Sequence, residues 1–196
     1  MRDERSDGYR SRVDLSLTHA GTYQPGRPFA LRALWLLVEA VILLNPLVVS
    51  YGLKRLVLRT FGAKVGRGVL IKPGVHVKYP WRLTIGNYAW LGERVWIDNM
   101  EDVTIGSHAV VSQGAYVVTG NHDWSDPAMP LAPRPLSIAD GAWVGARAVV
   151  GPGSLLAADA VLTLGSVLVG TTEPAGVYSG VPATRVGSRK LRPAAE

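Results

Sequence analysis

The sequence predicts an all-β fold, a solenoid of short parallel strands with a helical cap before it and one ejected loop. Three observations lead to this prediction: an aliphatic residue recurs every six positions, a small or β-branched residue follows it four positions later, and a differently patterned apolar segment precedes the repeat. We therefore divide the chain into four parts. They are a polar tail (1–28), the cap (29–62), a β-helix domain (63–180) with its loop (122–137), and a C-terminal extension (181–196).

The six-residue period identifies the solenoid. Upstream it restarts twice after a slip of two residues, from Leu83 to Ile85 and from Val103 to Ile105. A helix repeats its apolar face near every 3.6 residues and a half-buried strand every second residue, so neither produces a period of six. Three hexapeptides per coil would stack each aliphatic residue on its equivalent, about 4.8 Å along the axis. The longest unbroken run is Ile138, Val144, Val150, Leu156, Leu162 and Leu168.

Two further positions of the repeat carry information. The residue after the aliphatic one is often glycine, as at Gly66, Gly86 and Gly106. We expect these glycines because the bends between strands need a positive φ. The small residue four positions after the aliphatic one fits the narrow interior near a corner, where a larger side chain would overpack. The two-residue slips are expected to add corner residues that bulge outward.

The helical cap is predicted from an apolar segment that charged residues interrupt. Phe29–Leu58 is strongly apolar, but its longest uncharged run, Ala40–Leu53, is shorter than the roughly 20 residues of a spanning helix. We predict a helix, a break at Asn45-Pro46, and a second helix, both packed on the first coils. The alternative for this segment is peripheral contact with an anionic membrane surface.

Composition restricts the class of protein. Hydrophobic residues make up 47% and charged residues 18% of the chain, which excludes a disordered polypeptide. The chain has no cysteine, so disulfides and thiol catalysis are excluded and a cytoplasmic location is favoured. The net charge of +6 comes from scattered basic clusters rather than from one motif, and we expect no nucleic-acid partner.

The repeat breaks once, and a histidine stands at the break. Asp123 occupies the place of the next aliphatic residue and the period resumes at Ile138, so the loop 122–137 leaves the solenoid wall. Loops of this length in compact domains are usually functional, and its prolines indicate a stiff arm. His122 is a candidate for proton transfer near neutral pH, with Asn121 and Asp123 beside it to orient the ring.

The local sequence resembles a known family. The string Thr119-Gly120-Asn121-His122-Asp123 is similar to the catalytic loop of hexapeptide-repeat acetyltransferases that act on sugar hydroxyls. Phe61–Gly66, Lys78–Leu83, Ile97–Asn99 and Ser179–Ala183 resemble the colanic-acid-type exopolysaccharide enzymes in particular. The resemblance implies a left-handed parallel β-helix, a homotrimer with its sites between neighbouring subunits, acetyl-CoA as acyl donor and no metal.

The resemblance also implies roles for individual residues. His122 would be the general base, assisted by Asp123. The residues expected to bind acetyl-CoA are Trp143, Gly145, Ala146, Leu164, Arg185 and Lys190. The residues expected to bind the sugar acceptor are Asp98, Asn99, Asn121 and Trp124.

Two other functions fit the same scaffold. A catalytically inactive solenoid that binds a partner is suggested by the run Leu162–Ser166, which departs from the Gly-Ala-Gly-Ser typical of the family. A metalloenzyme of the γ-carbonic-anhydrase type needs three histidines on one zinc ion. His76, His108 and His122 are present, but His108 and His122 lack the close spacing of that family. The expected location is the cytoplasm, with the membrane periphery as the alternative.

Overall fold

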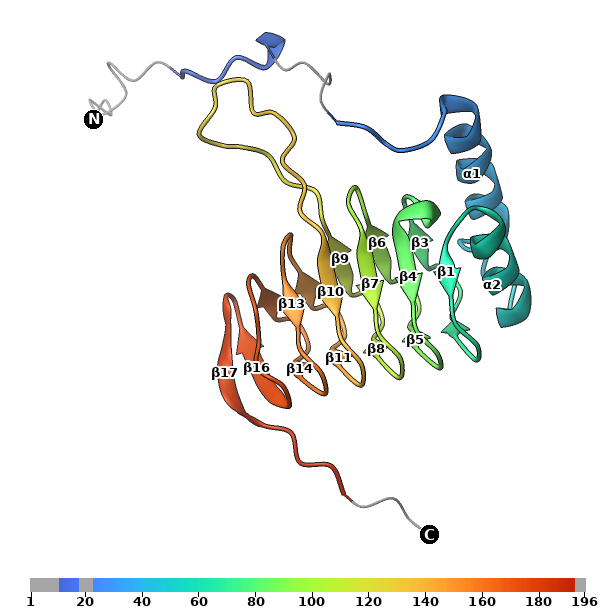
Figure 1. Ribbon diagram of the computed structural model, residues 1–196, viewed down its shortest axis with the longest axis vertical. Helices are drawn as coiled ribbons and strands as arrows, with labels where there is room; N and C mark the ends of the chain where they lie inside the picture. Colours follow the sequence, from blue (N-terminus) through green and yellow to red (C-terminus); the bar gives the residue numbers. More distant parts are fainter. Residues whose placement is uncertain (1–10, 18–22, 193–196) are drawn as a thin grey trace, which may run out of the picture.

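The computed structural model describes residues 11–17 and 23–192, and shows a three-sided prism of parallel strands with two helices at one end (Figure 1). Of the predicted polar tail, residues 1–10 and 18–22 lie outside this description, as do residues 193–196 of the predicted extension. The described part of the tail contains one 3₁₀ turn, Leu15–Leu17. The all-β solenoid predicted from the sequence is confirmed.

Successive strands belong to three sheets in turn, which we number in the order in which the chain enters them. The first sheet contains β1 (Lys64–Val65), β4 (Leu83–Ile85), β7 (Val103–Ile105), β10 (Leu136–Ile138) and β13 (Leu155–Leu156). The second contains β2 (Leu70–Ile71), β5 (Trp90–Leu91), β8 (Val110–Val111), β11 (Trp143–Val144), β14 (Val161–Leu162), β16 (Gly176–Gly180) and β17 (Ala183–Ser188). The third contains β3 (His76–Val77), β6 (Trp96–Asp98), β9 (Tyr116–Val118), β12 (Val149–Val150) and β15 (Val167–Leu168).

The register of the strands follows the predicted period. In the first sheet Ile85 pairs with Ile105, and Ile105 pairs with Ile138, so the aliphatic residues form one column. These side chains and their equivalents on the other two sheets point into the prism and are almost completely buried. The small residues, such as Ala109 and Ala142, are fully buried too. The six-residue period therefore arises because every coil contributes its aliphatic residues to one narrow core.

Extra residues collect at one corner, between the third and the first sheet. Residues 79–82 there form a short 3₁₀ turn (Pro80–Arg82), and residues 99–102 form the same corner one coil later. The long loop leaves from this corner as well, because β9 ends at Val118 and β10 begins at Leu136. The predicted outward bulges and the ejected loop are thus insertions at equivalent places. The loop spans 119–135, slightly earlier than predicted.

The glycines of the repeat have a different role from the one predicted. Gly86 does not adopt a positive φ, and a Cβ added there would lie 2.4 Å from the Ser107 nitrogen of the next coil. Positive φ occurs two positions later instead, at residues as different as Gly68 (67°) and Tyr88 (56°). At Gly66, Gly86 and Gly106 the backbone of the next coil passes too close for a side chain. The bend itself tolerates other residues.

Two helices cover the open edge of the first coil. Strands β1, β2 and β3 have no coil on their other side, so their backbone groups need partners. Helix α1 (Phe29–Ile42) supplies them for β3: Trp35 Nε1 donates to the Val77 carbonyl at 2.8 Å, and the Val77 N–H donates to the Glu39 carboxylate at 2.5 Å. Both side chains are buried.

Helix α2 (Tyr51–Thr60) supplies partners for the other two edges. Lys54 Nζ donates to the Ile71 carbonyl at 3.3 Å, and Arg55 donates to the Val69 carbonyl at 2.8 Å. Arg59 donates to the Val65 carbonyl. Burial lowers the pKa of Lys54. Lys54, Arg55 and Arg59 of this segment therefore satisfy carbonyls of the first coil. Lys54 is completely buried, whereas Arg55 is half-buried and Arg59 is exposed.

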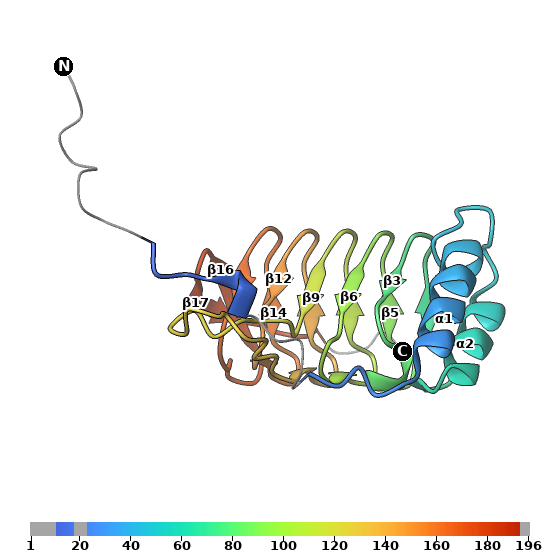
Figure 2. The same ribbon diagram turned by 90° about the horizontal axis from the view of Figure 1, so that it is seen from above.

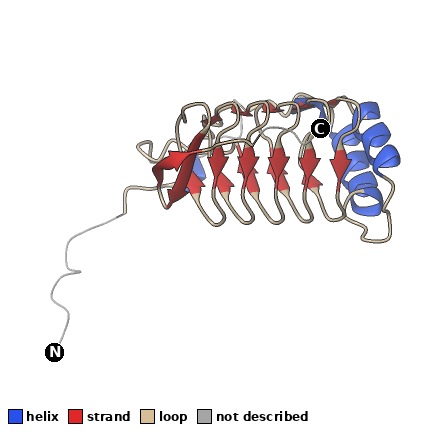
Figure 3. Ribbon diagram, turned by 90° about the horizontal axis from the view of Figure 1, so that it is seen from below, coloured by secondary structure: helices blue, strands red, loops and turns tan. Residues whose placement is uncertain are grey.

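The last coil ends in a different way. Strand β17 folds back antiparallel on β16 and extends the second sheet, so residues 183–188 of the predicted extension belong to this sheet (Figure 3). Neither α1 nor α2 has the length and apolarity required to cross a membrane, and the same holds for every other helix in residues 11–17 and 23–192.

The close contact between coils gives a testable prediction. Gly86→Ala would force its Cβ into the backbone of the next coil and should lower the free energy of unfolding by about 1–3 kcal/mol or more. Gly187→Ala is the matched control, because a Cβ there meets nothing within 4 Å. Urea denaturation of both variants measures the difference. Equal stabilities would contradict the packing argument.

Candidate active site

The long loop is a hairpin arm with fixed hydrogen bonds at its base. The Ala132 N–H donates to the Asn121 carbonyl at 2.8 Å, and the Asp123 N–H donates to the Pro130 carbonyl at 2.9 Å. His122 and Leu131 face each other as an antiparallel bridge between these bonds. His122 is therefore held at a defined place on the arm, close to its root.

One ring nitrogen of His122 has a backbone partner. Its Nδ1 lies 2.7 Å from the carbonyl oxygen of Met129, a residue with a positive φ of 45°. A carbonyl oxygen only accepts hydrogen bonds, so the neutral imidazole carries its proton on Nδ1. The unprotonated Nε2 is then left with its lone pair, as a general base requires. The ring is exposed to solvent.

Asp123 does not orient the histidine in this structure. Its carboxylate accepts hydrogen bonds from the Ser125 N–H at 3.0 Å and from the Ser125 hydroxyl, and these bonds lower its pKa. The residue shapes the turn that follows His122. The orienting group predicted at Asp123 is supplied by the Met129 carbonyl, which no side-chain pattern in the sequence could indicate.

The predicted acceptor residues fall into two groups. Asn121 and Trp124 are exposed on the arm, and the side chain of Trp124 is 89% accessible. The Asp98 carboxylate forms an ion pair with Lys78 at 2.8 Å and accepts a hydrogen bond from the Tyr116 hydroxyl at 3.0 Å. Burial and the neighbouring Asp98 carboxylate raise the pKa of Tyr116 to about 12.

Asn99 is buried inside the corner. Its side chain is fully buried, its Oδ1 accepts from the Tyr79 N–H at 2.9 Å, and its Nδ2 donates to the Tyr79 carbonyl at 2.6 Å. These two bonds join consecutive coils at the corner from which the arm leaves. Asn99 therefore supports the corner, and its predicted part in acceptor binding stays a prediction.

A polar pocket lies at the root of the arm and was missed by the sequence reasoning. It has a volume of about 420 Å³, and Leu131, the partner of His122, lines one side. Arg82 and Glu101 form an ion pair of 2.7 Å on its wall. The remaining lining residues are Tyr23, Gln24, Ala132 and Pro133. Only the fold brings residues 23–24 to this corner.

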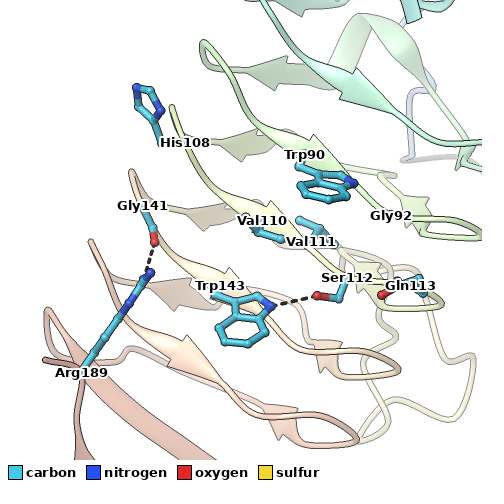
Figure 4. Close-up of a pocket in the computed structure, with 10 residues that line it drawn as sticks. All are labelled: Trp90, Gly92, His108, Val110, Val111, Ser112, Gln113, Gly141, Trp143 and Arg189. Carbon is cyan, nitrogen blue, oxygen red and sulfur yellow. Dashed lines mark hydrogen bonds between the residues drawn. The ribbon is translucent and has the colours of Figure 1, made fainter. Parts of the chain in front are cut away.

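A second hollow, of about 360 Å³, crosses the outer face of the second sheet (Figure 4). Trp90 and Trp143 stand two coils apart with the smaller Val110 between them. Trp143 Nε1 donates to the Ser112 hydroxyl at 2.8 Å, which fixes the indole. Arg189 closes one end by donating to the Gly141 carbonyl at 2.7 Å. We call this hollow the tryptophan groove.

The predicted donor residues lie along this side of the prism. Gly145 and Ala146 follow Trp143 at the corner between the second and third sheets, and Leu164 stands at the same corner one coil later. The Gly145 N–H already donates to the Leu162 carbonyl, so Ala146 is the amide left for a ligand. Arg185 on β17 makes a 3.6 Å contact with Glu173. Lys190 is exposed just beyond β17, next to Arg189 of the groove.

His122 and the tryptophan groove lie on different sides of one subunit. The arm leaves from the corner between the third and first sheets, which is opposite the second sheet in a three-sided prism (Figure 1). One side of the prism is roughly 15 Å wide or more, given the rise per residue of a strand. A single chain therefore does not bring the imidazole to the groove.

No three His, Cys, Asp or Glu side chains converge as metal ligands anywhere in the described part of the chain. His76 contacts the Glu39 carboxylate at 2.7 Å, and His108 stacks on Tyr88 beside the tryptophan groove. The three histidines that a zinc site would need are thus separately engaged within one subunit.

Comparison with known proteins identifies the class. No family model matches the chain. It is 35% identical over 156 residues to the "Putative colanic acid biosynthesis acetyltransferase WcaF" of Escherichia coli (strain K12), covering 80% of this chain and 86% of that protein. It is 26% identical over 123 residues to the galactoside O-acetyltransferase of the same organism, covering 61% of each.

Solved structures share the fold. A hexapeptide-repeat acetyltransferase of Vibrio cholerae, solved with acetyl coenzyme A, superimposes with a TM-score of 0.74 at 22% identity, over 83% of this chain and 88% of that one. A maltose O-acetyltransferase of Clostridium difficile 630 gives 0.69 at 19% identity, over 83% and 84%. The fold class is therefore the left-handed parallel β-helix of these proteins. The chain belongs to the hexapeptide-repeat acetyltransferases, in the group of the colanic acid enzyme.

The raised pKa of Tyr116 predicts an alkaline loss of stability. The unfolded chain loses this proton above the ordinary pKa near 10, whereas the folded chain keeps it until about 12. The contribution is therefore complete below pH 10 and disappears as the pH rises to 12. We expect Tyr116→Phe to lose less free energy of unfolding than the wild type between pH 9 and 11, measured by urea denaturation. Parallel losses in both proteins would rule this out.

Proposed function

We propose that this enzyme transfers an acetyl group from acetyl-CoA to a hydroxyl of a sugar, in the synthesis of an exopolysaccharide or a related glycan. The observation that carries the proposal is the free Nε2 of His122, on a hairpin arm of an acetyltransferase fold. The related proteins support the substrates: one is named for colanic acid synthesis, one for galactosides, and one was solved with acetyl coenzyme A. A cytoplasmic location is part of the proposal, and the absence of cysteine from the chain supports it.

The chemistry requires a base and a proton return. Nε2 of His122 takes the proton of the acceptor hydroxyl while the hydroxyl oxygen attacks the thioester carbonyl carbon. Collapse of the tetrahedral intermediate breaks the carbon–sulfur bond, and the imidazolium returns the proton to the leaving thiolate. The Met129 carbonyl holds Nδ1–H throughout, so it also stabilises the imidazolium as it forms. No enzyme nucleophile is needed.

Two sites are assigned to the two substrates. The donor lies along the tryptophan groove and the adjoining corner, with Trp143 beside the pantetheine arm, Ala146 and Leu164 next to it, and Arg185 and Lys190 toward the phosphates. The acceptor enters the polar pocket at the root of the arm, where the Asn121 carbonyl accepts a hydrogen bond from Ala132 of the pocket wall. Arg82 and Glu101 there offer the mixed donors and acceptors that sugar hydroxyls require. Asp98 is a further acceptor-binding residue in this proposal.

The site is shared between subunits of a homotrimer. His122 and the groove lie on different sides of each prism, so a neighbouring copy has to bring its groove to the arm. A cyclic trimer repeats this contact three times with the same geometry. The arm then reaches out of its own subunit toward the donor of the next.

The first prediction separates His122 from Asp123. His122→Ala should lower the rate of acetyl transfer by about 10²–10⁴-fold, the usual contribution of a positioned base. Asp123→Asn should cost no more than about tenfold, because Asp123 bonds Ser125 and not the imidazole. The assay measures thiol release from acetyl-CoA with a panel of simple glycosides. Near-normal turnover by His122→Ala would show that the catalytic assignment is wrong.

A mixing experiment tests the shared site. His122→Ala and Trp143→Glu should each be inactive alone, the second because it blocks the groove. Co-expressed chains form mixed trimers, in which about a quarter of the interfaces combine an intact His122 with an intact groove. Activity near that fraction is expected, with the trimer verified by light scattering. A mixture as inactive as its parents would mean that each site lies within one subunit.

A further inference from the structure

The outward face of helix α1 is apolar throughout. Every exposed position of this helix is Ala, Leu, Val or Phe, and its two charged residues, Arg32 and Glu39, lie on other faces. The exposed positions cover an arc of about 160°, at 100° per residue. The exposed large side chains of α1 and the link to α2 are Phe29, Leu34, Leu36, Leu37, Val41, Leu44, Leu47 and Val49.

Such a face needs a partner. The opposite side of α1 already buries Trp35 against the first coil, as does Leu43 just beyond the helix, so apolar side chains occupy two opposite sides of this helix. Helices of that kind are normally enclosed on every side, and soluble monomers rarely leave so much contiguous apolar surface in water. Two residues of α2, Leu53 and Leu56, extend the exposed surface beyond α1. We call these exposed residues of α1, the link and α2 the apolar end face. It lies at the end of the prism away from β17 (Figure 2).

The charge around the apolar end face is strongly positive. Residues 23–72 contain eight basic residues and one acidic residue, Glu39, whereas the whole chain has a net charge of +6. Glu39 is buried against His76 and Val77, and Lys54 is buried as well, so seven basic residues and no acidic residue of this range reach the surface. The cap and the first coil therefore hold all of the chain's net positive charge.

One of these cations borders the apolar end face directly. Arg32 and Lys78 line a mostly apolar pocket of about 300 Å³ with Phe29, Leu36 and Tyr79. Lys78 is paired with Asp98, but the buried Nε of Arg32 has no hydrogen-bond acceptor within the residues that the structure describes. A phosphate or carboxylate at the mouth of this pocket would pair with the positive charge of Arg32.

We propose that the apolar end face binds the surface of a membrane that contains anionic phospholipids. Helix α1 would lie in the plane of the interface, because its 14 residues span about 21 Å and fall short of the bilayer core. Leu36, Leu37 and Val41 enter the boundary of the acyl chains, and the surrounding basic residues face the phosphates.

The charge distribution also favours a lipid surface over a second copy of the chain as the partner of the apolar end face. A second copy would bring two strongly positive ends into contact, which repels. An anionic lipid surface is complementary in both respects, since it offers an apolar layer beneath a layer of negative charge. The proposal concerns where the enzyme is held, and it stands or falls independently of the acetyl-transfer function.

Vesicle flotation tests the binding. The intact protein should float with phosphatidylcholine vesicles containing 30% phosphatidylglycerol, and at least about tenfold less with phosphatidylcholine alone or at high salt. Leu37→Glu should reduce partition by at least about tenfold, the value of burying one leucine. Val186→Glu, on β17 at the far end, is matched in exposure (62% against 63% for Leu37) and should bind like the wild type.

Acetylation of a soluble glycoside by Leu37→Glu controls for folding. Unchanged turnover together with lost flotation supports the proposal. Equal binding of the wild type to neutral and anionic vesicles, or equal flotation of Leu37→Glu and wild type, would overturn it.

A fluorescent label separates lipid from protein as the occupant. The chain has no cysteine, so Leu37→Cys carries a single environment-sensitive dye, with Val186→Cys as the control. A blue shift at residue 37 that requires anionic vesicles, and is quenched by spin-labelled lipid, supports insertion. A blue shift without vesicles that grows with protein concentration means that a second copy covers this face, and the membrane proposal is then wrong.

Discussion

The contact between one coil and the next is the constraint from which the other features follow. Adjacent coils lie at the spacing of paired strands, about 4.8 Å, so each interior side chain sits directly on its equivalent. At Gly86 and Gly106 the next backbone passes within 2.6 Å of where a Cβ would be. A chain under this constraint has little freedom in its walls. Variation is left to the corners, the outward residues and the two ends.

The residues to which we assign a function lie at the corners, among the outward residues and at one end. The corner between the third and first sheets absorbs insertions in successive coils, and the largest of them carries His122. Outward residues of the second sheet, Trp90 and Trp143, make the tryptophan groove without any change to the core beneath them. The rigid wall fixes the distances between these residues, because each distance depends on the number of coils between them. The packing of the core therefore determines the geometry of the site.

The backbone groups at the two ends of the solenoid obtain their hydrogen-bond partners in different ways. A solenoid exposes unpaired backbone groups at its first and last coils, which invites pairing with other chains. At the start, side chains of α1 and α2 bond the carbonyls of β1, β2 and β3, and apolar surface is left on the outside. At the finish, β17 pairs with β16 inside the same sheet. Only the first end carries the apolar surface that we propose as the membrane-binding site.

The sequence alone determined the solenoid, its register and the place of the arm, because a period of six is a local property that each hexapeptide repeats. It also placed His122, since a break in a strict repeat is visible without coordinates. It did not determine how the imidazole is oriented: the Met129 carbonyl is a backbone group, and Asp123 and Asn99 are engaged by Ser125 and Tyr79. The sequence did not predict the polar pocket for the same reason, because only the fold brings Tyr23 close to Glu101. The tertiary structure decided these points because hydrogen bonds to backbone atoms and contacts between distant segments leave no periodic trace in the sequence.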